Sequence, residues 1–169
     1  MKTIKGDLIN LAKEGRFDVI AHGCNCQGIM SAGIAKQMAQ EFGADRFPME
    51  VRSRIGYNIS KLGNIDYYPI FRRTFKEVTT YLATALKPET REKLCILINC
   101  YTQFNPGKGL DLDALRLCLK KINHIFRQKH IGLPKIGCGI AGGNWKEVKQ
   151  IIKEELYSME VTIVEYEKE

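Results

Sequence analysis

Long apolar runs are missing from this sequence of 169 residues. No stretch approaches the roughly 20 apolar residues that cross a bilayer, and residues 1–7 have no apolar core of the length that a signal peptide needs. We therefore expect an intracellular, cytoplasmic protein with no membrane partner. The six cysteines are expected to be reduced thiols, because disulfides are rare in chains without a secretory signal.

Several phosphate-handling and metal-binding motifs are also absent. No G-x-x-x-x-G-K-[ST] string occurs, which excludes a Walker loop. No arginine follows Cys24, Cys26, Cys100 or Cys138 at the spacing that a cysteine phosphatase requires. Cys24 and Cys26 resemble half of a zinc site, but the histidines show no zinc spacing with a second cysteine pair. We expect neither a metal nor another cofactor.

The composition is that of one globular domain over residues 1–169, with 44% hydrophobic and 27% charged residues. The formal net charge is +7, and residues 46–93 alone carry ten Lys/Arg against five Asp/Glu. A basic surface attracts phosphate-bearing partners, from nucleotides to nucleic acid, without specifying which. A nucleic-acid partner is therefore a less favoured alternative. A solvated face that only keeps the protein soluble explains the charge as well.

Apolar runs alternate with helical periods along the chain. Short apolar runs predict strands at residues 18–21, 94–101, 131–136 and 161–164. Helical spacing of apolar residues predicts helices within 34–42, 112–126 and 145–156. The middle of the chain is expected to hold a helix at 49–54, a strand at 65–70, and a helix or strand at 75–86. This alternation predicts an α/β fold, a three-layer α/β/α sandwich with a mixed, mostly parallel central sheet.

Two glycine-bearing loops each follow a predicted strand and precede a predicted helix. We call residues 22–35 the first loop and residues 137–143 the second loop. In open α/β sheets ligands bind at the carboxyl ends of strands, where helix N-termini offer unpaired amides to anions. These loops are therefore the candidate ligand site.

The second loop also contains G-x-G-x-x-G, at Gly137, Gly139 and Gly142, and Glu165 follows at the distance of a ribose-binding acid. A dinucleotide-binding sheet would continue for several more strands, whereas four residues follow Glu165 here. We interpret the motif as a phosphate cradle, which needs only glycines and the start of a helix.

Three segments, in this order, resemble macro domains. They are Lys5-Gly6-Asp7-Leu8, residues 20–28 continuing through Gly33-Ile34-Ala35, and residues 133–140 before Trp145. The similarity spans the chain except for residues 44–93. It is strongest to the branch that contains yeast-type ADP-ribose 1″-phosphate phosphatases and ADP-ribosyl-glutamate hydrolases. The resemblance implies the macro domain fold, with ADP-ribose or ADP-ribose 1″-phosphate as the partner.

The resemblance also implies roles for individual residues. Asp7 would accept a hydrogen bond from the adenine amino group, with the Leu8 amide nearby, and Tyr166 would stack on adenine. Asn25 would hydrogen-bond the distal ribose, and His22 would be the catalytic acid or base. The diphosphate would lie between two sets of backbone amides: Gly28, Gly33 and Ile34 on one side, and Gly137, Cys138, Gly139, Ile140, Ala141, Gly142, Gly143 and Asn144 on the other.

The residues alone leave structural alternatives open for the same positions. Asp7 is also suited to cap a short helix, Asn25 to hold a turn, and His22 to pack at the end of a strand. Asn144 is placed to cap the helix that follows the second loop, and Trp145 is expected in the core.

Departures from the family pattern bear on the reaction. Hydrolases that release ADP-ribose from glutamate carry a lysine after the central strand and an aspartate in the second loop. Cys100 or Tyr101, and Ala141, stand at those places here. Our leading hypothesis is a metal-independent phosphatase that acts on ADP-ribose 1″-phosphate. The alternatives are a hydrolase acting on ADP-ribosylated protein or nucleic acid, and a reader that binds ADP-ribose without chemistry.

Overall fold

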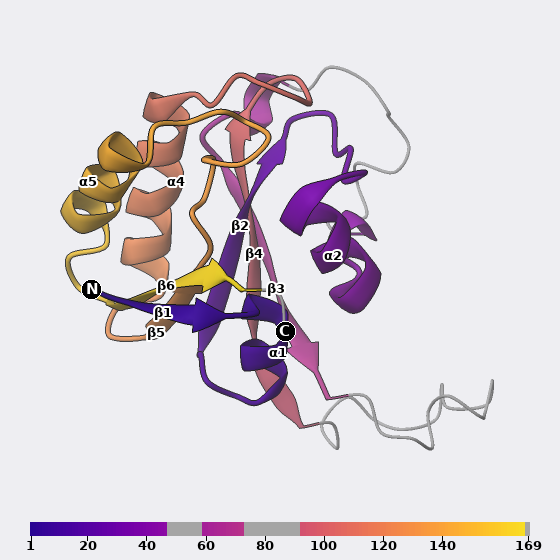
Figure 1. Ribbon diagram of the computed structural model, residues 1–169, viewed down its shortest axis with the longest axis vertical. Helices are drawn as coiled ribbons and strands as arrows, with labels where there is room; N and C mark the ends of the chain where they lie inside the picture. The colour runs from indigo at the N-terminus through magenta and orange to yellow at the C-terminus, as the bar shows by residue number, and fades with distance from the viewer. Residues whose placement is uncertain (47–58, 73–91, 168–169) are drawn as a thin grey trace.

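The computed structural model describes residues 1–46, 59–72 and 92–167. Within them, one sheet has the strand order β1-β6-β5-β2-β4-β3 (Figure 1). All neighbouring strands are parallel except β3, which runs antiparallel to β4. The strands are β1 (Lys2–Gly6), β2 (Val19–Asn25), β3 (Ile65–Phe71), β4 (Lys93–Gln103), β5 (His130–Leu133) and β6 (Glu160–Tyr166).

Helices cover both faces of this sheet. The α-helices α4 (Leu112–Ile125) and α5 (Trp145–Glu155) lie on one face, and α1 (Leu8–Lys13) and α2 (Gly33–Phe42) lie on the other (Figure 1). Two short 3₁₀ turns, η1 (Ala44–Arg46) and η3 (Ile59–Lys61), complete the described elements. The predicted α/β/α sandwich with a mixed, mostly parallel sheet is confirmed. No helix in the described ranges is both long and apolar enough to cross a bilayer.

The alternation of side chains along β2 explains why the sheet has a core on each face. Successive strand residues point to opposite faces. Val19 and Ala21 therefore pack in the cluster beneath α4 and α5, while Ile20 packs with Met38 beneath α1 and α2. Full burial of an aliphatic side chain such as Ile20 contributes about 2 kcal/mol, so both layers are held to the sheet mainly by apolar burial.

Several strand limits differ from those that periodicity predicts. The strand expected at residues 18–21 continues to Asn25, so the beginning of the first loop is strand. The strand expected at 131–136 ends at Leu133, before Pro134. Residues 2–6 form β1 although they are mostly exposed and carry no apolar run. The expected strand at 65–70 is confirmed as β3, while the predictions for 49–54 and 75–86 lie outside the described residues.

Candidate functional site

A pocket of about 710 Å³ opens at the carboxyl ends of the parallel strands. Both glycine loops line it, because β2 and β5, which lead into them, are neighbours in the sheet. The loops meet across the pocket: a Cβ atom on Gly33 would lie 3.2 Å from Ile140 Cδ1. Gly33 also has a φ of +58°, which disfavours a side chain at this crossing. The two loops therefore line one cavity.

The start of α2 provides a first row of unused backbone amides, at residues 33–35. Their N–H groups donate to no acceptor within the described parts of the chain, and the first bond of the helix runs from Lys36 N to Ala32 O at 3.2 Å. Ala32 is the N-cap and has no side chain able to cap the helix. The free amides and the helix dipole make this end attractive to an anion. We call these amides the first amide row.

The second loop provides a matching row. The amides of Gly137, Gly139, Ile140 and Ala141 also find no acceptor among the described residues, and all four residues line the pocket. Three other amides close the loop upon itself: Cys138 N to Lys135 O at 3.0 Å, Gly142 N to Gly139 O at 3.0 Å, and Gly143 N to Gly137 O at 2.9 Å. The loop is therefore shaped by internal bonds that leave one set of donors unused. We call that set the second amide row.

Leu110 holds the second loop in place from behind. A Cβ atom on Gly137 would lie 2.7 Å from Leu110 Cδ1, and Gly137 has a φ of +72°. A Cβ atom on Gly143 would lie closer still to Leu110 Cδ2, so a side chain at either position would displace Leu110. The amides of Gly109 and Leu110 both donate to Ala141 O, at 3.1 and 3.2 Å. These contacts join the loop after β4 to the second loop and fix the geometry of the second amide row.

The pocket contains little charge that could bind an anion. Of the residues that the structure places around it, Asp7, Glu165 and Lys135 are charged. Lys135 Nζ lies 3.0 Å from Glu165 Oε1, so the cation is already paired. An anionic ligand would therefore be bound chiefly by main-chain dipoles rather than by a free lysine or arginine.

Eleven of the sixteen site residues expected from the sequence line the pocket: Asp7, Leu8, Asn25, Gly33, Ile34, Gly137, Cys138, Gly139, Ile140, Ala141 and Tyr166. The other five, outside the lining, are His22, Gly28, Gly142, Gly143 and Asn144.

Four of these five residues shape the loops instead. The Gly28 amide closes a turn onto Asn25 O at 3.2 Å, and Gly142 and Gly143 close the second loop. Asn144 caps α5, since its Oδ1 accepts a hydrogen bond from Lys146 N at 2.9 Å. The structure therefore gives these four residues a supporting role in the loops, and their contact with a ligand stays a prediction.

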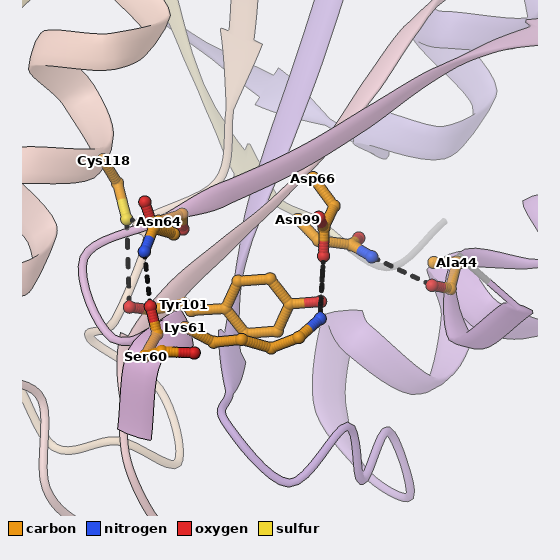
Figure 2. Close-up of polar contacts among 8 residues, drawn as sticks. All are labelled: Ala44, Ser60, Lys61, Asn64, Asp66, Asn99, Tyr101 and Cys118. Atoms are coloured by element: carbon orange, nitrogen blue, oxygen red, sulfur yellow. Dashed lines mark hydrogen bonds and ion pairs between the residues drawn. The ribbon is translucent and has the colours of Figure 1, made fainter. Parts of the chain in front are cut away.

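His22 is the main correction to the expected site. Because β2 extends to Asn25, His22 lies within the strand and is 0% exposed. Its Nε2 lies 2.8 Å from Asn99 Oδ1, and Asn99 Nδ2 donates to Ala44 O at 2.9 Å. Figure 2 shows the second of these bonds, which ties β4 to η1. Burial lowers the pKa of His22 to about 4, so the imidazole is neutral at physiological pH. The geometry gives His22 a place in the core instead of contact with a ligand.

Asn25 lines the pocket, yet its side chain already organises the first loop. Its Nδ2 donates to Ile29 O at 2.7 Å, and its Oδ1 accepts from the amides of Gln27 and Ile29 at 3.1 and 3.2 Å. The turn-holding alternative is therefore present in the structure, and contact with a ribose stays a prediction.

Asp7 combines a cap with a place in the pocket. Its Oδ1 accepts hydrogen bonds from Ile9 N at 2.8 Å and Asn10 N at 3.0 Å, which starts α1. Both bonds end on the same oxygen atom. The carboxylate can therefore accept a further hydrogen bond on Oδ2 while it caps the helix.

Thr102 and Gln103 line the pocket at the end of β4, and sequence reasoning missed them. The residues that it considered there, Cys100 and Tyr101, are buried and lie outside the lining. Gln103 Nε2 donates to Asn105 O at 2.7 Å and to Gly107 O at 3.1 Å, which shapes the loop that follows. Little in the sequence indicated that these two residues belong to the pocket, because their position depends on the unexpected length of β4.

A half-buried polar network forms around Tyr101 (Figure 2), whose side chain packs with Cys24 and Cys26. Lys61 Nζ donates to Asp66 Oδ2 at 3.1 Å and to Tyr101 Oη at 3.2 Å, and it lies 4.5 Å from the centre of the Tyr101 ring. The network joins η3 and β3 to β4. Burial raises the pKa of the Cys24 thiol far above its usual range, so Cys24 stays protonated and is a poor nucleophile.

Comparison with known proteins identifies relatives along the whole chain. No protein-family model matches it. A protein of Enterobacteria phage T4, described as an uncharacterized 17.5 kDa protein in the tk-vs intergenic region, is 32% identical over 171 residues, which cover 99% of this chain and 97% of that protein. The ADP-ribose 1″-phosphate phosphatase of Saccharomyces cerevisiae is 23% identical over 176 residues, 95% of each chain.

Solved structures share the fold. The macrodomain of Thermus aquaticus DarG matches with a TM-score of 0.60 and 21% identity, over 99% of this chain and 97% of that one. Thermosipho africanus DarTG in complex with ADP-ribose matches with a TM-score of 0.66 and 16% identity, over 98% of this chain and 41% of that one. The chain belongs to the same family as the phage T4 protein and has the macro domain fold.

Proposed function

We propose that the protein binds ADP-ribose in the pocket, with the diphosphate between the two amide rows. The observation that carries this proposal is the pair of rows itself: unused backbone amides at residues 33–35 face those of the second loop across one cavity. A diphosphate presents two adjacent anionic groups, which suits two opposed sets of donors. The paired state of Lys135 leaves main-chain donors as the principal match for that charge.

The two ends of the pocket suit the rest of the ligand. At one end, Asp7 offers a carboxylate for the adenine amino group, and Tyr166, which is 66% exposed, offers a ring for stacking. At the other end, Asn25, Thr102 and Gln103 line the pocket, and the Thr102 hydroxyl, which has no hydrogen-bond partner among the described residues, is suited to a sugar. The likeness in fold to DarTG, whose structure contains ADP-ribose, supports ADP-ribose as the ligand.

Hydrolysis of ADP-ribose 1″-phosphate is the second candidate function. The alignment with the yeast phosphatase over 95% of each chain favours it. Backbone donors that are already oriented stabilise charge on a transferring phosphate without reorganisation. In this scheme the buried His22 acts only through the fold, so the reaction would depend on the amide rows and on side chains at the end of β4.

Calorimetry combined with a phosphate-release assay tests both candidates. Titration with ADP-ribose is expected to give saturable binding. Phosphate release from ADP-ribose 1″-phosphate in the presence of a chelator would support the phosphatase. Binding of ADP-ribose without turnover of that compound or of ADP-ribosylated protein or nucleic acid would support a reader. Absence of any heat with millimolar ADP-ribose would contradict the proposal as a whole.

A further inference from the structure

The ion pair between Lys135 and Glu165 makes no ligand contact in the function proposed so far. Glu165 lies near the end of β6, and Lys135 follows the end of β5. The register that pairs Leu133 with Ile163 continues toward these two residues and brings them side by side. Nζ and Oε1 lie 3.0 Å apart, and the side chains are 43% and 38% exposed. Both residues line the pocket, so a ligand can reach the pair.

The pair lies between the base end of the pocket and the second amide row. In β6, Glu165 directly precedes Tyr166, and Lys135 comes two residues before Gly137. All four residues line the pocket, so we place these side chains beside a ligand that reaches from Tyr166 to Gly137. In a nucleoside diphosphate the sugar joins the base to the phosphates. If the base and the diphosphate bind as proposed, the pair therefore faces the sugar nearest the adenine.

The chemistry of the pair suits a vicinal diol. A carboxylate is only an acceptor, and its two oxygen atoms can accept hydrogen bonds from two neighbouring hydroxyl groups. The ammonium of Lys135 holds one of these oxygen atoms, and its own position is restrained by the Trp145 ring, whose centre lies 5.7 Å away. The carboxylate is thereby held in a defined orientation. A phosphate at the same place would be repelled by it.

On the basis of the proposed function, we propose that Glu165, positioned by Lys135, recognises the hydroxyl groups of the adenosine ribose. The site thus selects a ribonucleotide with a free 2′-hydroxyl. It disfavours both a 2′-deoxyribonucleotide, which removes one of the two hydroxyl donors to the carboxylate, and a 2′-phosphorylated nucleotide, which brings like charges together.

The test compares the binding of ADP and 2′-deoxy-ADP to the wild-type protein and to Glu165→Met. We expect the wild-type protein to bind ADP about tenfold more tightly, the effect of one hydrogen bond to a charged group. Glu165→Met should bind the two nucleotides equally. Glu160→Met is the matched control, because Glu160 lies on the same strand, pairs with Lys2 at 3.1 Å and is outside the pocket. This control should keep the wild-type preference.

Adenosine 2′,5′-bisphosphate provides a second measurement, in which a change at Glu165 should increase affinity. Glu165→Gln removes the negative charge and frees Lys135 to meet the 2′-phosphate, so binding of this probe should strengthen. The inference is overturned if the wild-type protein binds ADP but does not discriminate against 2′-deoxy-ADP, or if Glu165→Met keeps the discrimination. If the folded wild-type protein binds neither ADP nor ADP-ribose, the proposed function fails together with this inference.

Discussion

Replacing Gly139 by glutamate should weaken ADP-ribose binding about 100-fold, and replacing it by glutamine should have a much smaller effect. Gly139 lines the pocket within the second amide row, and a Cβ atom there meets nothing within 4 Å. The fold therefore tolerates a side chain at this position. Two like charges about 4 Å apart near a protein surface repel by roughly 4 kcal/mol before salt screening, and screening reduces that value.

The pair of Gly139 variants separates charge from size, because glutamine and glutamate have nearly the same shape. Calorimetric titration of both variants with ADP-ribose, at low and at moderate salt, measures the effect. The deficit of Gly139→Glu relative to Gly139→Gln should shrink as salt is added. Equal affinities for the two variants would mean that the diphosphate does not lie at the second amide row.

Acidification should destabilise the folded protein through His22. The pKa of this buried imidazole is lowered from 6.5 to about 4 by burial, so the unfolded chain takes up the proton first as pH falls. The stability that comes from the neutral, buried histidine is fully present above about pH 6.5 and is lost progressively toward pH 4. The shift corresponds to a loss on the order of 3 kcal/mol across that range.

His22→Gln is the variant that isolates this effect. Its amide can still donate to Asn99 Oδ1, but it does not titrate, so the difference in unfolding free energy between the two proteins should narrow as pH falls from 6.5 to 4. Carboxylates that titrate in the same range contribute equally to both. Urea unfolding at several pH values measures the difference. Parallel pH profiles of the unfolding free energy for the two proteins would contradict a neutral, buried His22. The folded His22→Gln protein should still bind ADP-ribose, because His22 does not line the pocket.

Sequence patterns predicted the fold and the glycine loops that line the pocket, because both follow from local signals. Apolar runs and helical spacing are set by burial, and the layers seen around the sheet obey them. Glycine loops that begin helices leave amides unpaired wherever they occur, so Gly33 and Gly139 were found from the sequence. Asn144 was also predicted correctly as a cap, since its role depends only on the residues of the helix it starts.

The roles of individual side chains were harder to predict, because they depend on where strands end. A strand that stopped at residue 21 would have placed His22 in a loop, whereas four additional positions paired with β4 keep it in the strand, where it is buried in the core. β4 also continues two residues beyond its predicted end at residue 101, and these two residues, Thr102 and Gln103, line the pocket. The pairing of Lys135 with Glu165 depends on the register between β5 and β6, which no local pattern specifies.

The central claim is that the backbone amides of the two loops bind the diphosphate together. An amide-resolved NMR titration with ADP-ribose measures this most directly, because each N–H group reports its own hydrogen bond. The signals of residues 33–35 and of Gly137, Gly139, Ile140 and Ala141 should shift together along one saturation curve. Saturable binding that leaves either group of signals unmoved would contradict the claim.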